Sequence, residues 1–271
     1  MVFLFFALYP EAKSFIRYYD LKRDLSNRYF QTFLNDEIVL TVTGIGKLNI
    51  ATALGYTVGK YGETKDGIAL NIGIAGSKFQ EDKGRLYLVN KIIDNERKKV
   101  FVPDVLIDHS FEEKDLETFN YVVRAPASLE AAICDMEGSG FYEAASKFFE
   151  THQIYVLKIV SDSLDFERIS QKYVEELVGD KVEDIDRFIK KVRESFKTGE
   201  VFTQEEKEIM EVLSNNLHLT ESQKRILYKA CLHFKVREKK DIVFFKKFID
   251  IVVKTKKERE EAFEKILSYL R

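Results

Sequence analysis

Short apolar runs alternate with segments of helical periodicity along the first 165 residues of the chain. Val2–Leu8 is apolar throughout, as expected of a central strand that is covered on both faces. Pro10 fits the first turn of a helix that carries Phe15, Ile16 and Tyr19. Strands that alternate with helices predict a layered α/β domain. The other predicted elements are extended segments at Glu37–Thr43, Gly67–Ile74, Arg85–Ile93, Val100–Ile107, Phe119–Val123 and Ile154–Val160, and helices at Leu48–Tyr61 and Gly140–Phe149.

The pattern changes after Asp165, and only helices are predicted from there onward. Thr203-Gln-Glu-Glu206 and Thr220-Glu-Ser-Gln223 match the capping box, so each predicts the start of a helix. We therefore expect an α/β domain over residues 1–198 and a helical extension of unassigned role over residues 199–271. The other predicted helices of this part are Gln171–Val178, Val182–Phe196, Ile242–Val253 and Glu258–Leu270.

Composition points to a protein of a reducing compartment. The two cysteines, Cys134 and Cys231, lie far apart without metal-type spacing, which predicts a reduced cytoplasmic protein. The apolar start MVFLFFALYP lacks a basic segment and a cleavage site and is too short to span a bilayer. We therefore interpret it as a buried first strand, and we expect no membrane partner, no metal and no redox cofactor.

The helical extension has a local excess of positive charge. Between Lys224 and Lys257 there are 12 basic residues and 3 acidic ones, although the net charge of the whole chain is only −2. Such a segment could be a solvated helix face, or it could bind nucleic acid or an acidic partner. No recognised nucleic-acid motif accompanies it, so a solvated face is favoured. Dimer contacts or a lid over a site are further alternatives.

Three acidic residues stand near the ends of predicted strands, where α/β proteins place their sites. They are Glu11, Glu137 and Asp162. Each also has a structural explanation, because a carboxylate at the start of a helix or turn can accept hydrogen bonds from free backbone N–H groups. Taken singly, the structural explanation is favoured for each residue, and their shared placement at strand ends shifts the balance only in part toward a functional site.

Two glycine-rich loops follow predicted strands. Gly44-Ile-Gly46 precedes Lys47, and Asn71-Ile-Gly-Ile-Ala-Gly76 forms the second loop. Neither the Walker pattern nor the Rossmann fingerprint fits, because Leu48 stands where the former needs Ser or Thr, and Asn49 where the latter needs a small residue. The glycines permit a tight turn and a close approach of the backbone to a ligand.

Five segments in order resemble the nucleoside phosphorylase and nucleosidase superfamily. They are ALYPEAK, TVTGIGKLNIATAL, NIGIAGS, CDMEGSGFYEAA and KIVSDSLD, and they cover about the first 200 residues. They look most like the hydrolytic branch typified by methylthioadenosine/S-adenosylhomocysteine nucleosidase. The resemblance implies a three-layer α/β/α fold with a mixed central sheet, a nucleoside substrate, no cofactor and a homodimer.

The resemblance also implies roles for the matching residues. Glu11 would activate the attacking water, and Asp162, oriented by Ser161, would protonate the departing base or form a hydrogen bond with it. Glu137 would bind the ribose hydroxyls, with Met136 packed on the sugar, while Asp135 serves the turn. Gly46 and Ile74 would lie on the substrate side of the two glycine loops. These roles fit the chemistry, because cleavage of an N-glycosidic bond leaves positive charge on the ribose and negative charge on the base.

Missing arginines favour water over phosphate as the nucleophile. The phosphorylases place arginines in the first loop and in the strand before the second, where this chain has Tyr9-Pro10-Glu11 and Leu70-Asn71. A phosphate-dependent phosphorylase is one alternative. A non-catalytic member that binds a nucleoside-like ligand or a protein is another. Lys47 could contact an anion, although a solvated lysine is favoured.

Departures from the family leave the base and the 5′ substituent open. Ile74 stands where a small polar residue is usual, Lys158 where an arginine is common, and the stretch from Val123 to Glu137 is short. A purine-type nucleoside is expected, whether 5′-modified, as in methylthioadenosine or futalosine, or free, as in adenosine or inosine. His109 is interpreted as a surface loop residue.

Overall fold

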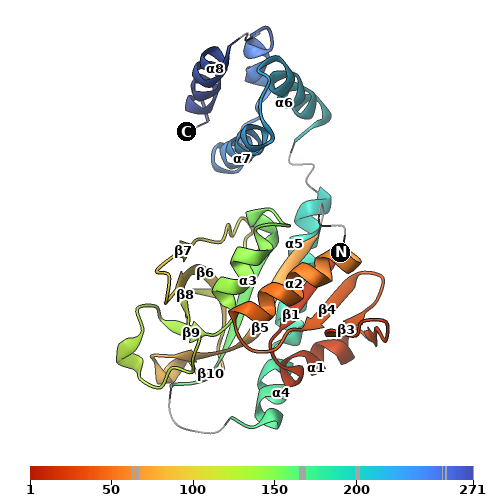
Figure 1. Cartoon of the computed structure of the whole chain (residues 1–271), viewed down its shortest axis with the longest axis vertical. Coiled ribbons are helices and arrows are strands. Elements are labelled where there is room, and N and C mark those ends of the chain that lie inside the picture. Colours follow the sequence, from red (N-terminus) through yellow and green to blue (C-terminus); the bar gives the residue numbers. More distant parts are fainter. Residues whose placement is uncertain are drawn as a thin grey trace. The chain divides into compact units, whose positions relative to one another are not determined.

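The computed structural model describes residues 1–62, 64, 67–164, 169–198, 202–251, 253 and 255–270 (Figure 1). Asp165 lies outside these ranges. No helix within them has both the length and the apolar character that crossing a membrane requires.

One mixed sheet joins all ten strands of the described residues (Figure 1). At its middle, β1 (Val2–Phe6) runs parallel to β4 (Ile38–Val42) on one side and to β5 (Ile68–Ser77) on the other. β5 also pairs with β10 (Ile154–Asp162) in parallel and with β9 (Ile133–Asp135) in antiparallel orientation. The other strands are β2 (Lys22–Arg23), β3 (Gln31–Leu34), β6 (Leu86–Asp94), β7 (Val100–Phe101) and β8 (Glu112–Thr118).

Five of these strands close into a ring. The pairings run from β10 to β6, β8, β9 and β5, and β5 pairs with β10 again. From β5 the sheet continues outward through β1, β4, β3 and β2, while β7 pairs with β6. Since β1, β5 and β10 are parallel, their carboxyl ends meet at one edge of the sheet, where ligands bind in open α/β sheets.

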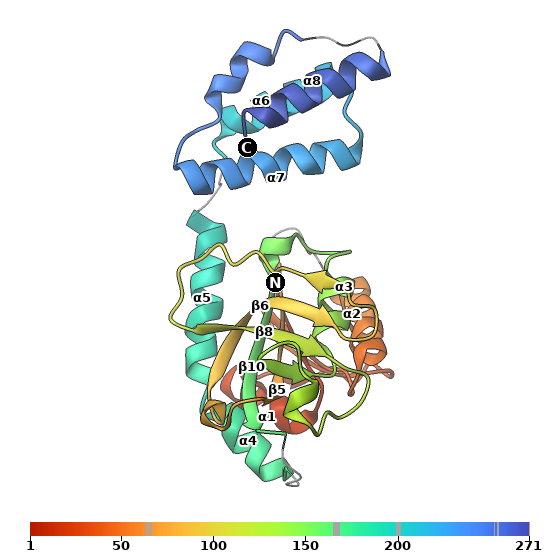
Figure 2. The ribbon, with the colours of Figure 1, turned by 90° about the vertical axis from the view of Figure 1, so that its left-hand side faces the viewer.

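Helices cover both faces of the sheet (Figure 2). α2 (Lys47–Tyr61) packs on α3 (Gly138–Ala145) over one face. α1 (Tyr9–Tyr18) packs on α4 (Gln171–Gly179) over the other, where α5 (Val182–Thr198) also lies. The result is a three-layer α/β/α architecture. Short 3-10 turns lie at η1 (Gln80–Asp82), η2 (Pro126–Ser128) and η3 (Thr151–Gln153).

Side chains of β1 alternate between the two helical layers, because successive residues of a strand point to opposite faces. Phe5 contacts Phe141 of α3, with ring centroids 5.8 Å apart, and Phe3 contacts Phe149 at 5.6 Å. Phe6 points the other way, and its ring lies 5.1 Å from a phenylalanine of α1, Phe15. All five residues of β1 are buried, so the prediction of a central strand at the start of the chain is confirmed.

Several predicted elements differ from those observed. Phe119–Val123 was expected to be extended but forms a loop, and the strand precedes it as β8. Ala75, predicted in a loop, continues β5. Extended structure at Val100–Ile107 is limited to the two residues of β7, and the helix expected at Ile242–Val253 is reduced to a 3-10 segment, η4 (Val243–Phe248). The sequence patterns did not predict β2 and β3.

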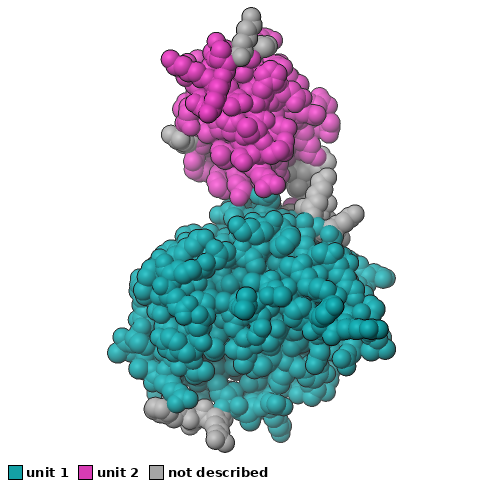
Figure 3. Space-filling model, viewed as in Figure 1, with its two compact units in different colours: residues 1–193 teal, residues 194–271 magenta. Residues whose placement is uncertain are grey.

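The structure divides into two compact units, Met1–Arg193 and Glu194–Arg271, coloured separately in Figure 3. The second unit contains α6 (Gln204–Asn216), α7 (Glu221–Glu238), η4 and α8 (Lys256–Ser268) around its own apolar core. Both predicted capping boxes are confirmed, with Thr203 and Thr220 as N-caps. The side chain of Glu206 is buried in this unit and accepts hydrogen bonds from the ammonium group of Lys235 at 2.6 and 2.7 Å.

Candidate active site

A hollow of about 200 Å³ lies in the first unit at the carboxyl ends of the central strands. Its lining includes Glu11, Glu137 and Asp162, which come from segments far apart in the sequence. Glu11 lies in the first turn of α1, after β1. Glu137 stands between β9 and α3, and Asp162 is the last residue of β10. The fold thus brings the three predicted carboxyl groups around one space.

Backbone groups hold the carboxyl group of Glu11. Oε2 accepts a hydrogen bond from the N–H of Leu8 at 2.7 Å, and Oε1 accepts one from the N–H of Ile74 at 2.9 Å. Burial raises the pKa of Glu11, although these two N–H groups act in the opposite direction. The absence of a side chain at Gly73 makes room for the carboxyl group, since a Cβ there would lie 3.0 Å from Oε1. Glu11 is therefore a fixed carboxyl group that binds a proton more readily than an exposed one.

Glu137 bridges the two loops that precede α2 and α3. Its Oε1 accepts a hydrogen bond from the N–H of Gly46 at 2.7 Å, and the residue is only 6% exposed. Burial raises the pKa of Glu137 to about 7, with a further contribution from the nearby carboxylate of Asp135. A carboxyl group in this state is costly to leave without hydrogen-bond donors, so it suits a ligand that supplies hydroxyl groups.

Asp135, which also lines the hollow, forms an ion pair that the sequence patterns did not predict. Its Oδ2 lies 2.8 Å from the ammonium group of Lys158, and both side chains are buried. Burial alone would lower the pKa of Lys158, but the carboxylates of Asp135 and Glu137 raise it. Asp135 also accepts hydrogen bonds from the N–H of Gly138 and the hydroxyl of Thr118, both at 2.8 Å. The predicted role of Asp135 in the turn is confirmed.

Asp162 and Ser161 end β10 beside the hollow. The Ser161 hydroxyl lies 2.6 Å from Oδ2 of Asp162, and the N–H of Leu164 donates to Oδ1 at 2.9 Å. The Ser161 hydroxyl also lies 3.2 Å from the carbonyl oxygen of Ala75. Asp162 is half-buried, so this carboxyl group is oriented by its neighbours and still reaches the space inside.

The remaining walls of the hollow are mainly apolar. Ile74 and Met136, both predicted to lie on the substrate side, are in the lining, together with Val123 and Leu164. Cys134 lines it as well, and burial raises the pKa of its thiol to about 12, so it remains protonated. An apolar wall with a few oriented polar groups is the usual composition of a small-molecule site.

The first glycine loop contributes backbone rather than a cation, and the predicted second loop, Asn71–Gly76, is part of β5. Gly46 donates its N–H to Glu137, as described, while Ile45 lines the hollow. Lys47 is not a free anion contact, because its ammonium group lies 3.2 Å from Asp94 and 3.3 Å from Glu96. Among the described residues that line the hollow, none is an arginine or a lysine. The described part of the lining therefore offers no cation that could clamp a phosphate.

His109 lies away from this site. Its side chain is 9% exposed and packs against Phe111 and Phe188, with Nε2 3.2 Å from a carboxylate oxygen of Glu113. His109 lies in a loop, as expected, but aromatic rings cover most of its side chain. In the described ranges, no group of three or more His, Cys, Asp or Glu side chains is arranged to hold a metal ion.

Solved structures that resemble this chain include nucleosidases. Methylthioadenosine/S-adenosylhomocysteine nucleosidase of Helicobacter pylori, bound to butyl-thio-DADMe-Immucillin-A, matches with a TM-score of 0.58 and 14% identity over 70% of this chain and 97% of its own. The enzyme of the same name from S. pneumoniae, with the transition-state inhibitor MT-ImmA, matches at 0.58 and 16% over 70% and 99%. Futalosine hydrolase of Helicobacter pylori matches at 0.58 and 15% over 70% and 97%. No family model and no curated protein sequence matches this chain. At these identities the likeness shows the fold.

Proposed function

We propose that this chain, which has the fold of the nucleoside phosphorylase and nucleosidase superfamily, is an N-ribosyl hydrolase that cleaves a purine-type nucleoside into base and sugar. The observation that carries the proposal is the convergence of Glu11, Glu137 and Asp162 on one largely apolar hollow. Each carboxyl group is already oriented by hydrogen bonds from the protein, and each meets one requirement of the reaction.

Glu137 is assigned to the ribose. Hydroxyl groups donate to a carboxylate in charge-assisted hydrogen bonds, and these stabilise the ionised form of a buried acid. With a pKa of about 7, Glu137 ionises readily when such donors arrive. One of its oxygens is already bound to the N–H of Gly46, so the other is the natural acceptor for the sugar. Met136 beside it would pack on the sugar ring.

Glu11 and Asp162 are assigned to the two proton transfers. A water molecule attacks C1′ of the ribose, the C1′–N bond breaks, and Glu11 receives the proton that the water releases. The electron pair of the broken bond stays on the base, and a proton delivered by Asp162 neutralises the negative charge that develops there. The raised pKa of Glu11 suits a general base, because a weakly basic carboxylate would be a poor proton acceptor.

Water is the preferred nucleophile because the described lining contains no cation for phosphate. Lys47, the residue best placed in sequence for that task, is held by two carboxylates.

We also propose that the chain acts as a homodimer. In support, Ile45, Tyr121 and Val122 line the hollow and are 48%, 58% and 66% exposed, so a second copy could cover them.

A panel of nucleosides tests the proposal. Methylthioadenosine, S-adenosylhomocysteine, futalosine, adenosine and inosine would each be incubated with the protein, with and without phosphate, and the free base and the sugar product quantified. Base release together with free sugar in phosphate-free buffer is the expected result. A requirement for phosphate, with a sugar 1-phosphate as product, would identify a phosphorylase. Ligand binding without base release from any substrate would identify a non-catalytic member.

A further inference from the structure

Glu137 lies where the N-termini of two helices, α2 and α3, meet. It directly precedes α3, and its hydrogen-bond donor, Gly46, directly precedes α2. The two starts are in close contact, since a Cβ placed on Gly140 would lie 2.6 Å from the carbonyl oxygen of Lys47. Any shift of one helix start against the other would therefore move the ribose-binding carboxylate of the proposed function.

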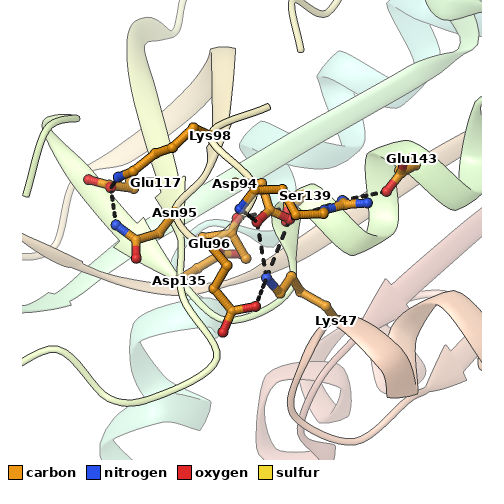
Figure 4. A network of polar contacts seen from close by, with 11 residues as sticks. Lys47, Asp94, Asn95, Glu96, Lys98, Glu117, Asp135, Ser139 and Glu143 are labelled. Atoms are coloured by element: carbon orange, nitrogen blue, oxygen red, sulfur yellow. Dashed lines mark hydrogen bonds and ion pairs between the residues drawn. The ribbon is translucent and has the colours of Figure 1, made fainter. Parts of the chain in front are cut away.

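One buried aspartate bonds to both helix starts. Asp94, the last residue of β6, has a fully buried side chain. Its Oδ2 accepts a hydrogen bond from the hydroxyl of Ser139, two residues after Glu137, at 3.0 Å. Its Oδ1 and Oδ2 lie 3.2 and 3.3 Å from the ammonium group of Lys47, the residue after Gly46. Figure 4 shows Asp94 between these two partners.

Asp94 is itself rigidly held. The backbone N–H of Arg97 donates to Oδ1 at 3.0 Å, and the guanidinium of the same residue donates to Oδ2 at 3.0 Å. Burial alone would raise the pKa of Asp94, but the hydrogen bonds from Arg97, Ser139 and Lys47 lower it to about 2. Asp94 is therefore a permanent anion. The Arg97 guanidinium extends the connection to α3, where it contacts Glu143 at 2.5 Å.

We propose that Asp94 is a positioning residue for Glu137: by holding Lys47 and Ser139 together, it fixes the contact between Gly46 and Glu137 and thus the carboxylate that binds the ribose hydroxyls. This inference rests on the proposed function, because it takes the ribose as the ligand of Glu137. Asp94 is not in the lining of the hollow, so it acts only through the two helix starts.

The substitution Asp94→Asn tests this mechanism while keeping the shape of the side chain. It weakens the bond to Lys47 and loosens the two helix starts. Because Glu137 contacts the ribose both before and during the reaction, we expect KM to rise about tenfold and kcat to change less. A substrate analogue that lacks the 2′ and 3′ hydroxyls should bind the variant and the wild type equally, since it makes no use of Glu137.

A double-mutant cycle separates positioning from a general loss of stability. If Asp94 acts through Glu137, Asp94→Asn should cause no further rise in KM when it is added to Glu137→Gln. The matched control is Asp186→Asn, which alters another buried aspartate that bonds Tyr18, Tyr19 and Lys190 outside the lining of the hollow. It should lower the melting temperature comparably and leave KM unchanged.

Two further variants provide the same test if the Asp94→Asn protein does not fold. Ser139→Ala and Lys47→Met each remove one of the two connections, and each should raise KM for the ribonucleoside only. Equal losses for ribonucleoside and analogue, or additive effects in the double mutant, would overturn the inference while leaving the proposed function intact. Absence of base release by the wild-type protein would instead overturn the proposed function, and with it the ligand on which this inference depends.

Discussion

At the scale of single residues, two carboxyl groups of the hollow are held by backbone N–H groups rather than by arginine or lysine. Leu8 and Ile74 hold Glu11, and Gly46 holds Glu137. Such donors fix the carboxyl groups without neutralising their charge, so burial can still raise the pKa of each. Raised pKa values at a cleft are typical of groups that exchange protons or bind polar ligands.

Replacement of the proposed general base tests the first of these groups. Glu11→Gln preserves the hydrogen-bond acceptor for Ile74 but cannot take up a proton, so kcat should fall roughly 10²- to 10⁴-fold with a small change in KM. Glu175→Gln is the control, because Glu175 contacts Lys13 and Arg17 of α1 outside the lining of the hollow. Steady-state kinetics in phosphate-free buffer measures both. A Glu11→Gln enzyme with nearly normal kcat would exclude Glu11 as the base.

The raised pKa of Glu137 predicts a dependence of stability on pH. The unfolded carboxyl group ionises near pH 4.5 and the folded one near 7, so the folded state binds more protons in this interval. The free energy of unfolding should therefore fall as the pH rises from about 4.5 to about 7. Glu137→Gln should weaken this dependence, leaving the part that Glu11 contributes, and stabilise the protein by roughly 1–3 kcal/mol at pH 8.

Urea denaturation at pH 5 and pH 8 measures this effect on the two proteins. The stabilised variant should also bind ribonucleosides more weakly, because a residue that serves a ligand can lower the stability of the empty protein. Parallel pH profiles for wild type and variant would show that Glu137 ionises normally and that its burial is not costly.

At the scale of secondary-structure elements, α2 and α3 approach each other so closely that one glycine decides their packing. In Gly140→Ala the new Cβ would meet the backbone of Lys47 at 2.6 to 2.7 Å, so the helices must separate. We expect a loss of roughly 1–3 kcal/mol in stability and a higher KM, since Glu137 lies at this contact.

Gly55→Ala is the matched control on α2, because a Cβ there meets nothing within 4 Å. An alanine inside a helix should stabilise it by up to about 1 kcal/mol relative to glycine. Thermal denaturation of the two variants gives the comparison. Equal melting temperatures would show that the contact between the two helices can relax freely.

The sequence patterns predicted strands correctly where the residues are mostly apolar, and they missed a strand that begins with charged residues. β1 is apolar throughout, and β4 and β10 are apolar apart from Thr41, Lys158 and the polar end of β10, so their positions follow from the sequence pattern. β8 was missed because it begins with Glu112, Glu113 and Lys114, and its first two residues are exposed although the strand pairs with β6 along its length. A strand whose faces are not uniformly apolar gives no alternation to detect.

The site shows the same division. Glu11, Glu137 and Asp162 could be predicted, since each stands at or just after the end of a strand and belongs to a recognisable segment. The pair between Asp135 and Lys158 could not, because it depends on how β9 and β10 register against β5. Ion pairs between distant segments depend on the tertiary structure, so the spacing of residues in the sequence does not predict them.

At the scale of the whole molecule, the hollow belongs entirely to the first unit, while the second unit has an apolar core of its own. A chain that ends after residue 198 should therefore fold and keep kcat/KM within about threefold of the full-length value. Circular dichroism and kinetics on this shortened protein provide the measurement. A folded but inactive product would show that the helical extension completes the site, as a lid or through dimer contacts.

The ring of five strands has a consequence for the behaviour of the protein at high concentration. Every described strand longer than two residues has a hydrogen-bonded neighbour on each side, and the outermost members, β2 and β7, are two residues each. β2 consists of Lys22 and Arg23, whose positive charges repel an approaching strand. The sheet thus presents almost no backbone on which fibrils could grow, and its assembly with other chains is left to side-chain surfaces.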